Sequence, residues 1–314
     1  MTIQGLVDFA REKTNFTTLQ DYIQFAREYL AFAFGADTLQ AVIVSQNENK
    51  YRFFQYKQDG HYNVSRPINS ALFLDAARFE QLYSEFLLVL DRSRDIEPTD
   101  TANRGLICSS IYTIQQSIGA ALDALPVGAS NAARKINGDL FERLIRLLIL
   151  RLGVSCTSGT VRVPVLVDGT EQFKMNYQHD LIIERGEIKA IGSVKTSSKD
   201  RIDKVFIDKF LYSKLTGTNI PHVAIFLNDV QRKDTGRPDR FGISTTFLPG
   251  HFKGYTVKLN PLDGVYYCDI RPSMVTDELL SKHIRTIDHF FCEDLWTFVS
   301  RTGSKAEIDP ESEL

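Results

Sequence analysis

The run of residues 222–227 constrains the fold of this chain most, because five of its six residues are apolar. An apolar run of this length without alternation is typical of a central strand that is covered on both faces. A helix is expected shortly before it, from four apolar residues at helical spacing: Ile202, Val205, Phe206 and Phe210. The order of expected helices and strands indicates a mixed sheet with helices on its flanks, an α/β (α+β) fold.

A strand, a turn and a second strand are expected before that helix. Residues 180–184 form the first strand, the chain turns at Arg185 and Gly186, and residues 187–195 return. Because side chains alternate along a strand, Ser193 and Lys195 share one face of the second strand. The hairpin therefore carries an acid, Asp180, close to a lysine.

This set of residues points to phosphodiester hydrolysis. That reaction needs a hard cation held by carboxylates and benefits from a fixed positive group near the developing charge. Asp180 and Lys195 supply one acid and the positive group. The usual strand signature has a second acid two residues before the lysine, where this chain has Ser193. Asp208, in the middle of the apolar residues 205–210, is the candidate for the second carboxylate.

On these residues the sequence resembles the PD-(D/E)xK nucleases and, within them, the CCGG family of type II restriction endonucleases. In that family Ser or Thr often stands two residues before the lysine, and an acid of the next helix takes over metal binding. The resemblance implies that Asp180, Ser193, Lys195 and Asp208 are catalytic and that Asp180 and Asp208 bind Mg2+. This chain departs from the family at Asp208, where Glu is usual, and at His179, where Pro is usual.

A third acid is expected on a helix at residues 138–152, which Asn137 can cap and Gly153 can end. Glu142 lies beside the apolar stripe of this helix, four residues before Arg146. A plain ion pair between the two is one interpretation. In the resembled family a Glu of the helix that opens the catalytic core approaches the metal, so we expect Glu142 to assist Asp180 and Asp208.

The triplet Lys199, Asp200 and Arg201 follows the lysine of the hairpin. Lys or Arg can donate to O6 and N7 of guanine, and a carboxylate can accept from the N4 amine of cytosine. The resembled family uses such a triplet for the C and G bases of its site, which implies a CCGG core, or CCNGG with a central pair that is not contacted. The alternative is a solvated first turn of a helix.

Composition and the positions of proline and glycine predict the domain organisation. With 314 residues and 43% hydrophobic content, the chain can bury a sizeable core. Pro126 and Gly128 mark a boundary between a mainly helical region at 1–128, for specificity or dimerisation, and a catalytic core at 129–302. An acidic, flexible tail is expected at 303–314.

Three further segments after residue 228 receive specific expectations. Residues 231–240 hold four basic residues and are expected to form a flexible loop, which either follows a phosphate backbone or is simply solvated. Residues 247–257 are expected to include a strand. Residues 277–299 are expected to form one helix with apolar surface for packing or dimerisation.

The four cysteines form no CxxC pair, which argues against structural zinc and a disulfide framework and fits a reducing bacterial cytoplasm. No stretch has the length of apolar residues needed to span a bilayer. The net charge of −2 argues against a protein that coats DNA indiscriminately but is compatible with a specific nuclease.

The expected function is therefore that of a type II restriction endonuclease: Mg2+-dependent cleavage of double-stranded DNA at a palindrome, leaving 5′-phosphate ends. A palindromic target requires at least a homodimer, and some relatives form tetramers. Two alternatives stay open: another PD-(D/E)xK nuclease acting in repair or on modified DNA, and a DNA-binding protein without catalysis. A histidine-aspartate metal phosphohydrolase, from His179 and Asp180, is disfavoured because it leaves Lys195 unexplained.

Overall fold

The structure is a computed structural model that describes residues 1–57, 64–198, 202–237, 239–305 and 307–310. The chain divides into two compact units. The first comprises residues 1–91, 97–144 and 229–246, and the second comprises 92–96, 145–228 and 247–314. The division differs from the boundary predicted at 128 and 129, because it falls within a helix and because a segment near residue 240 returns to the first unit.

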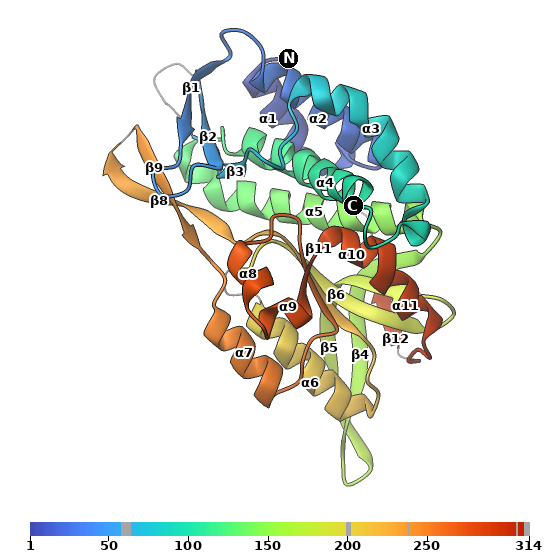
Figure 1. The fold of residues 1–314 in the computed structure, drawn as a ribbon. Coiled ribbons are helices and arrows are strands. Elements are labelled where there is room, and N and C mark those ends of the chain that lie inside the picture. The colour runs from blue at the N-terminus through green and yellow to red at the C-terminus, as the bar shows by residue number, and fades with distance from the viewer. Residues whose placement is uncertain (58–63, 199–201, 238, 306, 311–314) are drawn as a thin grey trace. The chain divides into compact units, whose positions relative to one another are not determined.

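Helices make up most of the first unit (Figure 1). They are α1 (Ile3–Arg11), α2 (Leu19–Ala33), α3 (Ala76–Asp91), α4 (Thr101–Leu122) and the larger part of α5 (Ser130–Arg151). Helix α4 is buried along most of its length. An ion pair lies at its C-terminal end, where the guanidinium of Arg66 donates to both carboxylate oxygens of Asp123 at 2.9 Å.

The start predicted for α5 is wrong. The helix begins at Ser130, so Asn137 lies in its interior and is not an N-cap. Asn137 is buried, and its side-chain oxygen accepts a hydrogen bond from Gln115 at 2.9 Å. Burial against α4 lets Asn137 satisfy its amide inside the helix, which spacing alone does not reveal.

The first unit also contains strands. A three-stranded antiparallel sheet consists of β1 (Leu39–Val44), β2 (Tyr51–Tyr56) and β3 (Ile68–Asn69). The flexible loop predicted at 231–240 is wrong, because this segment forms an antiparallel pair, β8 (Val230–Arg237) and β9 (Arg240–Thr245).

The second unit is built on a seven-stranded mixed sheet with the order β11-β10-β7-β6-β5-β4-β12. Strands β6, β7, β10 and β11 are parallel, whereas β5, β4 and β12 follow antiparallel to their neighbours. The predicted mixed sheet and the predicted buried central strand, β7, are both confirmed. The strands span β4 (Ser155–Val167), β5 (Thr170–Glu184), β6 (Ile188–Ser197), β7 (His222–Asn228), β10 (Gly264–Tyr267), β11 (Ile284–Thr286) and β12 (Glu307–Pro310).

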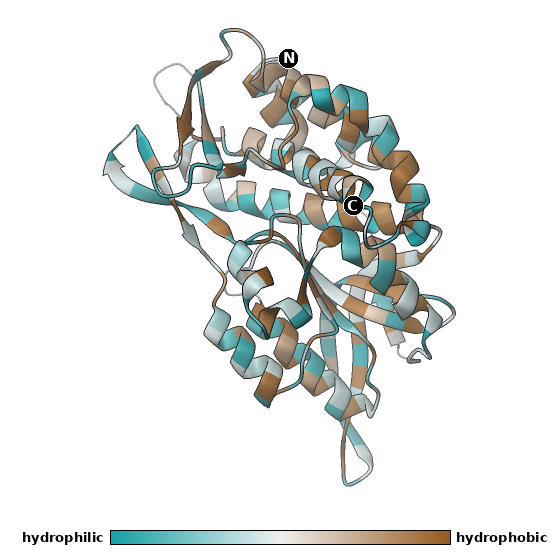
Figure 2. Ribbon diagram, viewed as in Figure 1, coloured by the Kyte–Doolittle hydropathy of each residue, from teal (hydrophilic) through white to brown (hydrophobic). Residues whose placement is uncertain are grey.

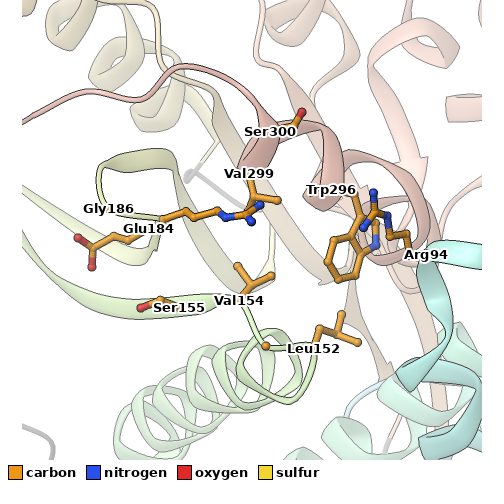
Figure 3. Close-up of a pocket in the computed structure, with 11 residues that line it drawn as sticks. Arg94, Leu152, Val154, Ser155, Glu184, Gly186, Trp296, Val299 and Ser300 are labelled. Atoms are coloured by element: carbon orange, nitrogen blue, oxygen red, sulfur yellow. The ribbon is translucent and has the colours of Figure 1, made fainter.

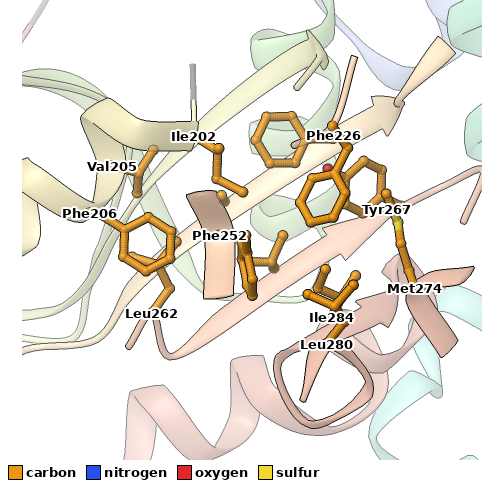
Figure 4. Packing of buried hydrophobic residues seen from close by; sticks show 13 residues of the cluster. Ile202, Val205, Phe206, Phe226, Phe252, Leu262, Tyr267, Met274, Leu280 and Ile284 are labelled. Atoms are coloured by element: carbon orange, nitrogen blue, oxygen red, sulfur yellow. The ribbon is translucent and has the colours of Figure 1, made fainter. Parts of the chain in front are cut away.

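Helix α6 (Ile202–Thr216) connects β6 to β7 and packs on one face of this sheet. Its first turns bury Ile202 and Phe206 in a core with Phe226 of β7 (Figure 4). Its last turns bury Tyr212 in a second core with Ile182 of β5 and Ile191 of β6. These contacts define the face of the sheet on which the active-site residues must be sought.

Three predictions for the C-terminal third are wrong. Helix α7 (Pro249–Lys258) replaces the predicted strand, with Pro249 in its first turn. The predicted single helix at 277–299 is interrupted by β11, which pairs with β10. The segment expected to be a flexible tail contributes β12, which pairs with β4. The short helical pieces are α8 (Pro272–Thr276), α9 (Leu280–His283), α10 (Ile287–His289), a π-helical turn (Phe290–Asp294) and α11 (Leu295–Ser300).

Two further observations concern the chain as a whole. All four cysteines are free and buried. Across the part of the chain that the structure describes, no helix combines the length and the apolar character that crossing a membrane requires.

Candidate active site

The sheet of the second unit forks at the predicted site. Strands β5 and β6 pair from Glu184 and Ile188 only as far as Leu181 and Gly192. Beyond this point β5 remains paired with β4, and β6 remains paired with β7. A register shift gives β5 one extra residue near Asp180 relative to β4, a bulge of the kind that re-aims side chains beside active sites. We call the divergence of β5 from β6 after Leu181 and Gly192 the fork.

Asp180 lies at the apex of the fork and bridges it. Its Oδ2 accepts the backbone N–H of Val194 at 2.8 Å and the ammonium of Lys195 at 2.6 Å. The carboxylate thereby accepts the N–H of Val194 in place of a main-chain carbonyl, because β5 is no longer paired with β6 at this position. The side chains of Asp180 and Lys195 are 15% and 30% exposed, so the pair is partly accessible to solvent.

Strand register shows which face these residues occupy. Ser193 pairs with Ala224 and Lys195 with Phe226 across the parallel strands β6 and β7. Paired residues on neighbouring strands project to the same face. Because Ala224 and Phe226 pack in the core beneath α6, Ser193 and Lys195 also project to the side of α6.

Asp208 comes to the same side of the sheet from α6. It pairs with Lys204, one turn earlier, and its side chain is 14% exposed. Its charge also acts on Tyr177 of β5: burial first, and then the Asp208 carboxylate, raise the pKa of the tyrosine. Tyr177 packs edge-on against Tyr212 of α6 with 6.2 Å between ring centroids. Asp180, Ser193, Lys195 and Asp208 are therefore all found on the side of the sheet that α6 covers.

Each of the two carboxylates has a lysine partner. Lys195 neutralises Asp180 and Lys204 neutralises Asp208. Within the described residues, no group of three or more His, Cys, Asp or Glu side chains is arranged to hold a metal ion by itself. A divalent cation at this site would thus need oxygen ligands from substrate or water in addition to any that the protein supplies.

The remaining predicted residues are placed as follows. Glu142 is half-buried on the part of α5 that belongs to the first unit. Arg146, its expected ion-pair partner, donates a hydrogen bond to the Ser158 hydroxyl. The role of Glu142 at the metal stays a prediction. Lys199, Asp200 and Arg201 lie outside the described residues.

His179 faces the protein interior next to Asp180. Its ring stacks on Tyr177 at 6.3 Å and meets His222 edge-on at 6.2 Å. Burial, followed by the neighbouring His222 and Lys204, lowers the pKa of His179 to about 3. A neutral, buried imidazole in this setting is part of the core beneath α6, which weighs against a histidine-aspartate phosphohydrolase.

Sequence reasoning missed Lys204 and Tyr177 as neighbours of the site. The signal for Lys204 was present, since it precedes Asp208 by four residues on a predicted helix and such a pair can meet. Tyr177 carried no comparable signal, because its position depends on the fork and on the packing of α6 against β5.

A pocket of about 630 Å³ in the second unit is distinct from the fork (Figure 3). It lies at the turn between β5 and β6, the opposite end of their paired segment from Asp180. Trp296 forms part of its wall, with the guanidinium of Arg94 5.6 Å from the ring centroid. The carboxylate of Glu184 points away from its centre in Figure 3, so the pocket offers no acid and lysine pair comparable to that at the fork.

The central mixed sheet flanked by helices confirms the α/β fold expected from the sequence, and the comparison with solved structures matches this fold to that of restriction endonucleases. Among solved structures, the chain is similar to the type IIP restriction endonuclease Kpn2I, with a TM-score of 0.67 and 17% identity over 96% of this chain and 99% of that chain. A complex of the restriction endonuclease PspGI with substrate DNA also matches, with a TM-score of 0.41 and 13% identity over 70% of this chain and 91% of that chain. No family model and no curated protein matches the sequence.

Proposed function

We propose that this chain is a type II restriction endonuclease that cleaves double-stranded DNA at a palindromic site with Mg2+. The observation that carries the proposal is the meeting of Asp180 and Lys195 at the fork, 2.6 Å apart, on the face that α6 covers. The fold shared with Kpn2I supports it, because the match covers 96% of this chain and so includes most of the sequence around the site.

The oxygen donors at the fork fit Mg2+. This ion takes oxygen ligands and commonly keeps several waters while one or two carboxylates and substrate phosphates complete its shell. Asp180 and Asp208 would hold it, and Glu142 would assist. Both hydrogen bonds that Asp180 accepts from described residues go to Oδ2, so Oδ1 is the oxygen best placed for a cation. When bound, Mg2+ supplies polarisation of a phosphoryl oxygen and lowers the pKa of a water ligand.

The protein residues have separate parts in the reaction. The N–H of Val194 fixes the position of the Asp180 carboxylate. The ammonium of Lys195, held beside that carboxylate, donates to the attacking water or to a phosphate oxygen and stabilises the charge that develops there. Ser193, two residues earlier on the same face, offers a hydroxyl that can hydrogen-bond the water. Cleavage would leave a 5′-phosphate and a 3′-hydroxyl.

Sequence recognition is assigned to Lys199, Asp200 and Arg201, with a CCGG or CCNGG core. The palindrome requires two active sites related by a twofold axis, hence a homodimer or a pair of dimers. The buried, free cysteines agree with the reducing bacterial cytoplasm where such an enzyme would act.

A plasmid digest tests the proposal. With Mg2+ the purified chain should give discrete bands, and with EDTA it should give none. Run-off sequencing of the ends should then locate one palindrome containing CCGG or CCNGG. A smear would indicate another nuclease with the same fold. Sequence-specific binding without cleavage under any divalent cation would indicate a DNA-binding protein and would refute the enzymatic assignment.

A further inference from the structure

The hairpin formed by β8 and β9 concentrates positive charge on an exposed element of the first unit. Residues 231–237, 239 and 240 are all exposed. Its basic residues are Arg232, Lys233, Arg237 and Arg240, against the two acids Asp234 and Asp239. The chain as a whole carries a net charge of −2, so this local excess of cations does not follow from overall composition.

The base of the hairpin is anchored firmly. Val230 and Ile243 pack in a core with Tyr51 and Phe53 of β2. The side-chain amide of Asn47 pairs with the main chain of Ile243 as a strand neighbour would, at 2.8 and 2.9 Å. The hairpin is therefore an ordered two-stranded ribbon and not the flexible loop that its composition predicts.

The charged side chains of the hairpin differ in the contacts that they make within the protein. Arg232 is committed to the fold, because it donates to the carbonyl of Val64 at 2.6 Å and lies over the ring of Phe241. Asp234 accepts the N–H of Gly236 at 2.8 Å, where the register of β8 against β9 shifts. The side chains of Lys233 and Arg237 make no hydrogen bond or ion pair with any described residue, and both residues are exposed. Their charges are thus available to a partner.

The partner that fits is the phosphate backbone of duplex DNA. Lys233 and Arg237 are four residue steps apart, which corresponds to at most about 13 Å along a strand, and phosphates recur about every 3.4 Å along the axis on each DNA strand. A two-stranded β-ribbon also has the width that the major groove admits. The outer part of the hairpin is coloured mostly hydrophilic in Figure 2, and none of its described residues is an exposed large hydrophobic residue of the kind that would favour a protein partner.

We infer that the β8–β9 hairpin binds DNA phosphates through Lys233 and Arg237, with a smaller share from Arg240. Arg240 contributes less because Asp239 lies 3.9 Å from its guanidinium. Phosphate contacts carry no sequence information, so the hairpin supplies affinity that is common to all DNA sequences. The inference rests on the proposed DNA-cleaving function, and chain continuity links the two: the hairpin begins at Val230, two residues after β7 ends.

A salt titration tests this inference. Binding of the full chain to two duplexes, one with the mapped cleavage site and one scrambled, is measured by fluorescence anisotropy in EDTA from 50 to 200 mM salt. The double variant Lys233→Gln and Arg237→Gln should lower the slope of log affinity against log salt by about 2 for both duplexes, since each phosphate contact contributes about 0.9. The Kd ratio of variant to wild type should accordingly be about tenfold larger at the lowest salt than at the highest.

The control is Arg78→Gln with Lys258→Gln, which removes the same charge from exposed positions on α3 and α7. It should leave the slope unchanged, and both double variants should melt at the wild-type temperature. An unchanged slope in the hairpin variant, while the wild type still cuts DNA, would overturn the inference but not the proposed function. A loss confined to the cognate duplex would also overturn it, because it would mean base contacts. A lowered slope in a chain that never cuts DNA would support the hairpin and refute the enzyme.

Discussion

Asp180 has two separable roles at the fork, and replacing it by Ala or by Asn distinguishes them. Its Oδ2 accepts the N–H of Val194 at 2.8 Å, where β5 no longer provides a main-chain acceptor. Asp180→Ala leaves this N–H without a partner in a strand interior, which costs about 1–3 kcal/mol. Asp180→Asn keeps an acceptor oxygen and should lose less than about 1 kcal/mol, since a neutral acceptor binds an N–H more weakly than a carboxylate does.

The chemical role predicts the opposite pattern, in which both variants fail equally. Neither Ala nor Asn supplies the negative charge that would hold Mg2+, so both should reduce cleavage by at least about 100-fold, the scale on which single electrostatic contributions to catalysis are lost. Stability is measured by urea denaturation and activity by the rate of plasmid cleavage at saturating Mg2+. Equal stabilities of the two variants would refute the bridging role of Asp180, and an active Asn variant would refute its role as a metal ligand.

Two further predictions concern stability. Burial lowers the pKa of His222 to about 3. Between about pH 6.5 and pH 3 only the unfolded chain therefore binds this proton, and the free energy of unfolding falls by about 1.4 kcal/mol for each pH unit of acidification. In urea denaturation, His222→Phe should make the decline from pH 6.5 to pH 5 shallower by about 2 kcal/mol, and parallel curves for variant and wild type would contradict this. Asp123→Ala should lower the free energy of unfolding by about 3–5 kcal/mol, because it leaves the Arg66 guanidinium without its carboxylate in a largely buried place; a loss below about 1 kcal/mol would show that water reaches Arg66.

The predictable part of the site is local in sequence. Asp180 and Lys195 meet because a hairpin with a turn at Gly186 brings them together, and Gly186 adopts the positive φ of 74° that this turn needs. That Ser193 and Lys195 share one face of β6 also followed from alternation along one strand. Neither inference required knowledge of any other part of the chain.

The fork was not predictable, because it depends on strands that are distant in sequence. It forms where β5 keeps its pairing with β4 while β6 keeps its pairing with β7. The same limit explains the errors elsewhere. β11 interrupts an apparently continuous helix because β10 offers it a sheet edge, and β8 shows no apolar alternation because only its first residue is buried.

In the proposed mechanism a cation competes with the lysines that pair with Asp180 and Asp208, and Lys204 provides a test of this. A cation held by Asp208 must displace or share the ammonium of Lys204, which is 64% exposed. An ion pair this exposed is worth up to about 1 kcal/mol. Lys204→Met should therefore lower the Mg2+ concentration for half-maximal cleavage by up to about fivefold, measured by titrating Mg2+ in the plasmid assay.

Lys214→Met on the same helix is the matched control, because Lys214 is exposed and contacts only the ring of Phe210 among the interactions that the structure describes for it. It should leave the Mg2+ requirement unchanged. A higher requirement in Lys204→Met would mean that Lys204 binds phosphate and does not compete with the cation. An unchanged requirement would remove Asp208 from the set of metal ligands, and Mg2+ would then depend on Asp180, Glu142 and the DNA itself. The titration thus decides whether the shorter Asp208 performs the role that a Glu usually has in the nucleases that this sequence resembles.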